Sequence, residues 1–89
     1  MYTYRFIVHG KVQGVYYRAT VSQEMKMGKF NGTIKNIDDG TVEVCVSLSD
    51  DDYASVISIL EEGSPKSVVE NITQSLYEEK FNDGFTILQ

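Results

Sequence analysis

Tryptophan is absent from this sequence, and cysteine, proline and histidine each occur only once. A lone cysteine cannot form a disulfide within the chain, and there is no cysteine pair with which to build a metal site. Cys45 lies in the alternating run VEVCV, where a small buried side chain is more typical than a nucleophile. We therefore expect neither disulfide nor metal chemistry from the sequence.

Basic residues are also scarce, because eight lysines and arginines stand against thirteen acidic residues and leave a net charge of −5. Such a surface repels nucleic acids and anionic membranes. No apolar run approaches the length needed to cross a bilayer, and the start of the chain lacks the pattern of a signal peptide. The sequence thus predicts a cytoplasmic protein without nucleic-acid or membrane partners, which must bind any anion at one local site.

The 89 residues suffice for a single domain spanning 1–89, with no repeat, linker or low-complexity segment. A domain of this size buries roughly 60% of the surface that its unfolded chain exposes. We expect a modest core and one small functional site.

Hydrophobic periodicity predicts two helices and five strands. Strands are expected within residues 3–10, 29–37, 41–48, 66–80 and 84–88, and helices over 18–27 and from Ser49 or Asp50 to about 62. The turn Asp38–Gly40 indicates a hairpin, because glycine accepts the positive φ of such turns. Irregular spacing between Val69 and Ile72 predicts a bulge in the fourth strand.

The order β-α-β-β-α-β, followed by a short last strand, is typical of the ferredoxin-like α+β sandwich. We expect an antiparallel sheet that carries both helices on one face, with right-handed crossovers. The fold alone does not fix a function, because many unrelated sites are built on it.

The stretch GKVQGVYYR, residues 10–18, joins the first predicted strand to the first predicted helix. Consecutive amides in such a turn can point into one hollow, and the helix N-terminus adds a partial positive charge. We expect Gly10 and Gly14 to permit a tight backbone path and to keep side chains out of the hollow. Arg18 can then fold over it and present a planar fork to two phosphate oxygens. The junction is therefore a candidate anion site.

This motif, followed by GTIKNIDDGTVE at residues 32–43, resembles the acylphosphatases. The similarity runs from Tyr4 to the end of the chain, through EGSPKSVVENI and GFTIL. The motif at residues 10–18 is quite specific to this family, and the motif at residues 32–43 is less so. The resemblance implies a monomeric enzyme without metal ion or cofactor, which hydrolyses small acyl phosphates to a carboxylate and inorganic phosphate.

The resemblance also implies roles for individual residues. In that family the loop after the first strand binds phosphate, or a sulfate ion in its place, through main-chain amides. An arginine completes the grip, and an asparagine on the second strand positions the attacking water. By position in the motif, substrate binding falls on Gln13, Gly14, Val15, Tyr16 and Tyr17, with Arg18 and Asn36 as the catalytic pair.

Four positions depart from the family pattern. Tyr17 replaces a phenylalanine or methionine, Thr33 an aromatic residue and Leu48 a glycine, while Ile34 is larger than usual. None of these changes removes a reacting group. They bear on how firmly the second strand supports Asn36, because a misplacement of about 1 Å can cost on the order of 10²-fold in rate.

The candidate residues also have purely structural interpretations. An asparagine beside Asp38–Gly40 is typical of turn chemistry, and Lys11 and Lys35 are as readily solubilising residues as anion-attracting ones. The alternative function is a module of the same fold that binds phosphate, an acyl phosphate or a protein without turnover. A nucleic-acid reader is a weaker alternative, which the acidic charge disfavours.

Overall fold

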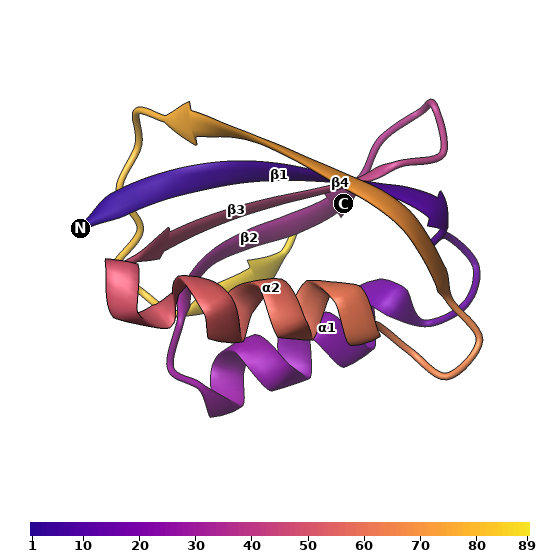
Figure 1. The fold of residues 1–89 in the computed structure, drawn as a ribbon, viewed down its shortest axis with the longest axis horizontal. Coiled ribbons are helices and arrows are strands. Elements are labelled where there is room, and N and C mark those ends of the chain that lie inside the picture. Colours follow the sequence, from indigo (N-terminus) through magenta and orange to yellow (C-terminus); the bar gives the residue numbers. More distant parts are fainter.

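The computed structural model describes all of residues 1–89. In chain order the elements are β1 (Tyr2–Lys11), α1 (Tyr17–Met27), β2 (Asn31–Asn36), β3 (Val42–Leu48), the 3₁₀ turn η1 (Asp50–Asp52), α2 (Tyr53–Glu62), β4 (Val68–Tyr77) and β5 (Phe85–Ile87). Both helices cover the same face of the sheet and leave the other face open (Figure 1). The predicted element order and the ferredoxin-like sandwich are confirmed.

The strand order across the sheet is β4-β1-β3-β2-β5, and the first four strands are antiparallel to their neighbours as expected. The last strand differs from the expectation, because β5 runs parallel to β2 and makes the sheet mixed. The path of the chain gives the reason. β4 ends beside the start of β1, and β2 starts at this same end of the sheet. A chain that crosses this end to the far edge must therefore enter beside the start of β2 and run along it.

The core lies between the sheet and the two helices. Alternation along β1 buries Phe6 and Val8 completely, as the sequence predicts, and the Tyr4 ring stacks on Phe6 with the centroids 5.7 Å apart. The helices contribute Val21 and Met25 from α1, and Val56 and Leu60 from α2, all completely buried. Neither helix is long and apolar enough to cross a membrane.

The predicted bulge lies where β4 passes the end of β1. The pairing between these strands slips between His9 and Gly10 and leaves Glu70 as the extra residue. Gly10 has a φ of 131°, and a Cβ at this position would lie 2.1 Å from the carbonyl oxygen of Val68. Gly10 thus allows the close approach of β4. The tight backbone path expected at Gly10 is therefore present, but it serves the pairing with β4, and Gly10 does not line the pocket.

The turn between β2 and β3 is held by its own side chains. One carboxylate oxygen of Asp39 accepts hydrogen bonds from the backbone N–H and the hydroxyl of Thr41, at 3.0 and 2.6 Å. These two bonds hold the pKa of Asp39 below its usual value. The predicted hairpin is confirmed, and it fixes the position of Asn36 at the end of β2.

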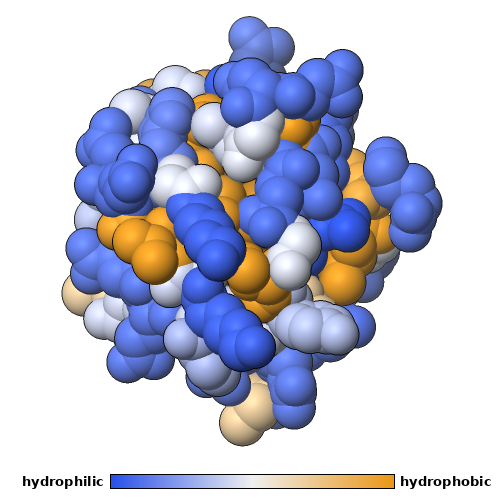
Figure 2. Space-filling model, turned by 90° about the vertical axis from the view of Figure 1, so that its right-hand side faces the viewer, coloured by the Kyte–Doolittle hydropathy of each residue, from blue (hydrophilic) through white to orange (hydrophobic).

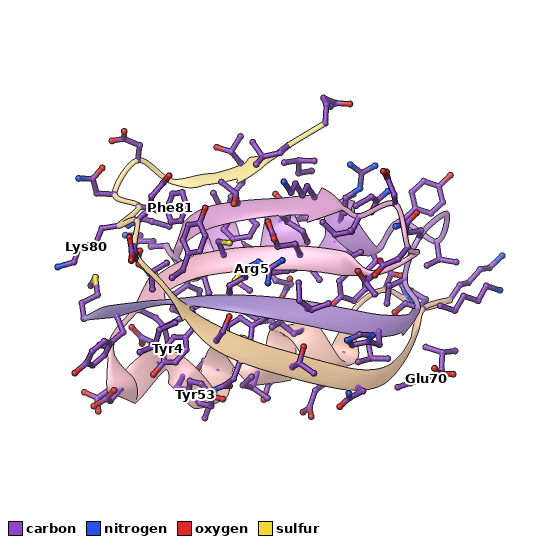
Figure 3. The ribbon with its side chains drawn as sticks, turned by 90° about the horizontal axis from the view of Figure 1, so that it is seen from above. Tyr4, Arg5, Tyr53, Glu70, Lys80 and Phe81 are labelled. Atoms are coloured by element: carbon purple, nitrogen blue, oxygen red, sulfur yellow. The ribbon has the colours of Figure 1, made fainter.

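The face of the sheet opposite the helices carries the protein's two ion pairs. Arg5, in the middle of this open face (Figure 3), lies 2.6 Å from Glu43, and Lys35 lies 3.8 Å from the same carboxylate. Cys45 is only 2% exposed, as expected from its alternating run. Burial raises the pKa of the Cys45 thiol to about 11, and the Glu43 carboxylate adds to the effect. The thiol is therefore protonated at neutral pH.

Cys45 makes folding sensitive to alkaline pH. As the pH rises past the ordinary thiol pKa of 9.0, the unfolded chain loses its proton before the folded chain does. The stabilisation is complete below pH 9 and is lost as the pH rises through about 11. We expect the free energy of unfolding to fall by roughly 1 kcal/mol more in the wild type than in Cys45→Ala between about pH 8 and pH 10, measured by urea denaturation. Equal pH slopes for the two proteins would contradict this expectation.

Candidate functional site

Three connections gather at one end of the sheet, at the right of Figure 1: the β1–α1 loop, the β2–β3 hairpin and the α2–β4 loop. Figure 2 views this end and shows hydrophobic residues exposed between mainly hydrophilic ones. A pocket of about 460 Å³ opens between the β1–α1 loop, the end of β2 and the residues after β5. Six of the seven residues singled out in the sequence line it, namely Gln13, Gly14, Tyr16, Tyr17, Arg18 and Asn36.

The loop backbone alternates in handedness. Gly14 has a φ of 74° and Tyr16 a φ of 64°, and no residue between them has a positive φ. Such an alternation turns successive N–H groups toward one concavity. A left-handed conformation costs a residue other than glycine roughly 1–2 kcal/mol, so the surroundings must hold Tyr16 in place. The Tyr16 ring itself is 82% exposed at the rim.

The amides of this region are available to a ligand. Among the backbone hydrogen bonds outside helices and strands, none is donated by residues 12–19, and the first one runs from Thr20 to the Tyr16 carbonyl at 3.0 Å. The first turn of α1 has no intrahelical acceptors for its N–H groups and contains no acidic side chain. The helix N-terminus therefore presents a partial positive charge to the pocket.

Arg18 adds a formal positive charge to these dipoles. Its Nη1 donates to the Leu88 carbonyl at 3.4 Å, which places the guanidinium between α1 and the residues after β5. The Leu88 N–H in turn donates to the Ile34 carbonyl at 2.8 Å and holds this segment against β2. Neither ion pair of the protein involves Arg18, so no carboxylate neutralises it.

Gln13 connects the loop to the strand end that carries Asn36. Its side-chain nitrogen donates to the carbonyl oxygens of Ile37 and Thr41, at 2.8 and 2.9 Å. Asn36 is exposed at the pocket edge, one residue before Ile37. The sequence placed Gln13 among the loop amides, but it did not indicate that the side chain bridges to the hairpin.

Val15 is the one candidate that does not line the pocket, because its side chain is buried in the core. Its carbonyl accepts a hydrogen bond from the Ser64 hydroxyl at 2.6 Å. Ser64 was not predicted from the sequence, since EGSP indicates only the end of a helix and a turn. On the other side of Tyr16, the buried Tyr17 hydroxyl donates to the Leu60 carbonyl at 2.7 Å, and burial raises the pKa of this phenol.

Three of the four positions that depart from the family pattern lie outside the pocket, and the fourth, Tyr17, lines it. Ile34 and Leu48 are buried in the core, and Thr33 is half-buried on the other face of β2. The Tyr17 ring belongs to the core, and its extra hydroxyl has a hydrogen-bond partner. Thr33, Ile34 and Leu48 do not line the pocket, whereas Tyr17 lines it at the start of α1.

Comparison with known proteins gives a consistent result. The family model for acylphosphatase matches residues 4–87. The chain is 38% identical to an acylphosphatase of Bacillus licheniformis over 85 residues, which cover 96% of this chain and 92% of that protein. It is 35% identical to an acylphosphatase of Haloarcula marismortui over 80 residues, which cover 90% and 88%. The crystal structure of acylphosphatase from Bacillus subtilis superposes over the whole of both chains with a TM-score of 0.91 and 34% identity.

The Gln13 bridge can be tested by removing its proton donors. In Gln13→Glu a carboxylate would face two carbonyl oxygens, so we expect the free energy of unfolding at pH 7 to fall by about 1–3 kcal/mol. Near pH 4 the protonated side chain can donate one hydrogen bond again, and the loss should shrink. Urea denaturation at the two pH values measures both effects, with Gln23→Glu on the exposed side of α1 as the matched control. A loss that does not depend on pH would argue against the bridge.

Proposed function

Because the chain belongs to the acylphosphatase family, we propose that this pocket hydrolyses the carboxyl-phosphate bond of small acyl phosphates to a carboxylate and inorganic phosphate. The observation that carries the proposal is the meeting of the left-handed loop, Arg18 and Asn36 at one pocket. We also propose that the enzyme acts as a cytoplasmic monomer without metal ion or cofactor, as expected from its sequence.

In this proposal the loop binds the phosphoryl group of the substrate. The N–H groups from Gly14 to Arg18 donate to its oxygens, since the helix start gives them no other acceptor. Arg18 adds a planar pair of donors and balances the negative charge. Because these donors are fixed before the substrate arrives, they stabilise charge in the transition state without reorganising. The same hollow would hold the phosphate product, or a sulfate ion.

Asn36 is the proposed partner of the water molecule. Phosphoryl transfer passes through a loose transition state, so it needs an oriented nucleophile and charge stabilisation more than a strong base. The Asn36 amide can hold the water by hydrogen bonds but cannot deprotonate it. The water oxygen forms the new bond to phosphorus as the bond to the acyl oxygen breaks, and that oxygen leaves with the electron pair as a carboxylate. The water proton ends on the released phosphate.

The pocket also has room for a small acyl group. Val12, Ala19 and Ile87 line it beside the polar groups and offer an apolar surface that carries no charge to repel a carboxylate.

A non-catalytic binding module would need the loop and Arg18 but not Asn36. The proposal is tested with benzoyl phosphate, whose hydrolysis we expect to exceed the spontaneous rate in the presence of a chelator. If only the spontaneous rate is seen, the binding module is the better interpretation.

Replacing Arg18 by glutamine should remove the only charged donor of the pocket. We expect Arg18→Gln to lower kcat/KM by at least ~10²-fold, which corresponds to about 3 kcal/mol of transition-state stabilisation. The other arginine offers a matched control, because Arg5 lies on the open face of the sheet and Arg5→Gln should keep near wild-type activity. If Arg18→Gln stays within a fewfold of the wild type, Arg18 is not the catalytic arginine.

Replacing Asn36 by alanine should separate catalysis from binding. We expect Asn36→Ala to reduce turnover to near the spontaneous rate while the Kd for inorganic phosphate changes by less than about threefold, because positioning water and holding the anion are separate tasks. Steady-state kinetics and calorimetric titration with phosphate give the two values. The exposed Asn82→Ala serves as the control. A parallel loss of phosphate binding in Asn36→Ala would show instead that Asn36 supports the loop.

A further inference from the structure

The β1–α1 loop, residues 12–16, is the proposed phosphate-binding loop. This loop and the start of α1 are hydrogen-bonded to the α2–β4 loop and to α2. The buried Ser64 hydroxyl, in the α2–β4 loop, donates to the Val15 carbonyl at 2.6 Å, and the buried Tyr17 hydroxyl, at the start of α1, donates to the Leu60 carbonyl in α2 at 2.7 Å. These bonds lie on either side of Tyr16, the residue with the left-handed backbone. We propose that Ser64 is a positioning residue for catalysis, which holds the Val15–Tyr16 peptide so that the Tyr16 N–H points into the pocket. This inference rests on the proposed function of the loop.

The geometry of the peptide group links Ser64 to the pocket. All peptide bonds of the chain are trans, so the Val15 carbonyl and the Tyr16 N–H point in opposite directions. The carbonyl is directed back to Ser64, which is only 4% exposed in the α2–β4 loop. The N–H therefore points away from Ser64, and Tyr16 itself lines the pocket.

Without this hydrogen bond, the backbone strain at Tyr16 would favour rotation of the Val15–Tyr16 peptide. A rotation of the Val15–Tyr16 peptide by about 180° would take the φ of Tyr16 from 64° to roughly −116°, the negative side of φ that residues other than glycine favour. It would relieve the backbone strain at Tyr16. The same rotation would turn a carbonyl oxygen toward the phosphate and remove one donor. Ser64 opposes it, because the turned carbonyl would leave a buried hydroxyl without its partner.

The Ser64 hydroxyl is well placed for this task because its own backbone is fixed. The Ser64 N–H donates to the Ser67 hydroxyl at 2.9 Å. The Ser64 carbonyl accepts from both the N–H and the hydroxyl of Ser67, at 3.1 and 2.9 Å. The donor thus belongs to a turn that is closed by hydrogen bonds within the α2–β4 loop.

The test measures binding and catalysis in Ser64→Ala beside the wild type. We expect the Kd for inorganic phosphate to rise about tenfold and kcat/KM for benzoyl phosphate to fall by about 10- to 100-fold in protein that circular dichroism shows to be folded. An NMR titration with phosphate reads the peptide directly. The Tyr16 amide proton should shift strongly downfield in the wild type, and this shift should be largely lost in Ser64→Ala.

A matched control is a second buried serine whose hydroxyl makes no hydrogen bond. Ser22 on α1 is also buried, but its hydroxyl has no hydrogen-bond partner, so Ser22→Ala should keep wild-type affinity and activity. If Ser64→Ala does not fold, Ser64→Cys retains the side-chain shape with a much weaker donor and takes its place in every measurement.

The outcomes separate this inference from the proposed function. A wild type that neither binds phosphate nor hydrolyses benzoyl phosphate would reject the proposed function itself. An active wild type with an equally active Ser64→Ala, and an unchanged Tyr16 amide shift, would overturn only the role of Ser64. A variant that loses stability but keeps its affinity for phosphate would show that Ser64 is merely structural, and this too would overturn the inference.

Discussion

The left-handed backbone at Tyr16 is the constraint on which the proposed site depends. The loop amides turn toward one hollow at the start of α1 because Gly14 and Tyr16 both have a positive φ. Glycine accepts this conformation freely and tyrosine does not. The structure therefore has to hold Tyr16 through its neighbours in the chain, and the Ser64 and Tyr17 hydroxyls tie Val15 and Tyr17 to the α2–β4 loop and to α2.

This arrangement would allow an acidic protein to bind the dianion of the proposed reaction. With a net charge of −5, the general field of the molecule repels phosphate, so binding relies on dipoles a few ångströms away. The two arginines differ in their surroundings. Arg5 and Lys35 are engaged by Glu43 on the open face of the sheet, whereas Arg18 has no carboxylate partner. Of the two arginines, only the one that lines the pocket is thus left without a carboxylate partner.

Local patterns in the sequence predicted most of the fold, because periodicity, turn glycines and the bulge all act over a few residues. The parallel pairing of β5 was not predictable in this way, since a three-residue strand takes its direction from where the chain crosses the sheet. The motif predicted which residues would meet at the pocket. It did not predict the Gln13 bridge or Ser64, because these side chains reach backbone groups 24 to 49 residues away and leave no local signature.

The proposed chemistry has two parts, anion binding by the loop and water positioning by Asn36. Both parts are therefore positioned by polar contacts rather than by the core. Gln13 ties the loop to the hairpin beside Asn36, and Ser64 fixes the loop against α2 and β4. Core packing around Ile34 and Leu48 sets the distance between the sheet and the helices, but neither side chain reaches the pocket. Volume changes in the core are consequently felt first as lost stability. Changes at the two polar anchors act on geometry, where errors of about 1 Å are enough to slow the reaction.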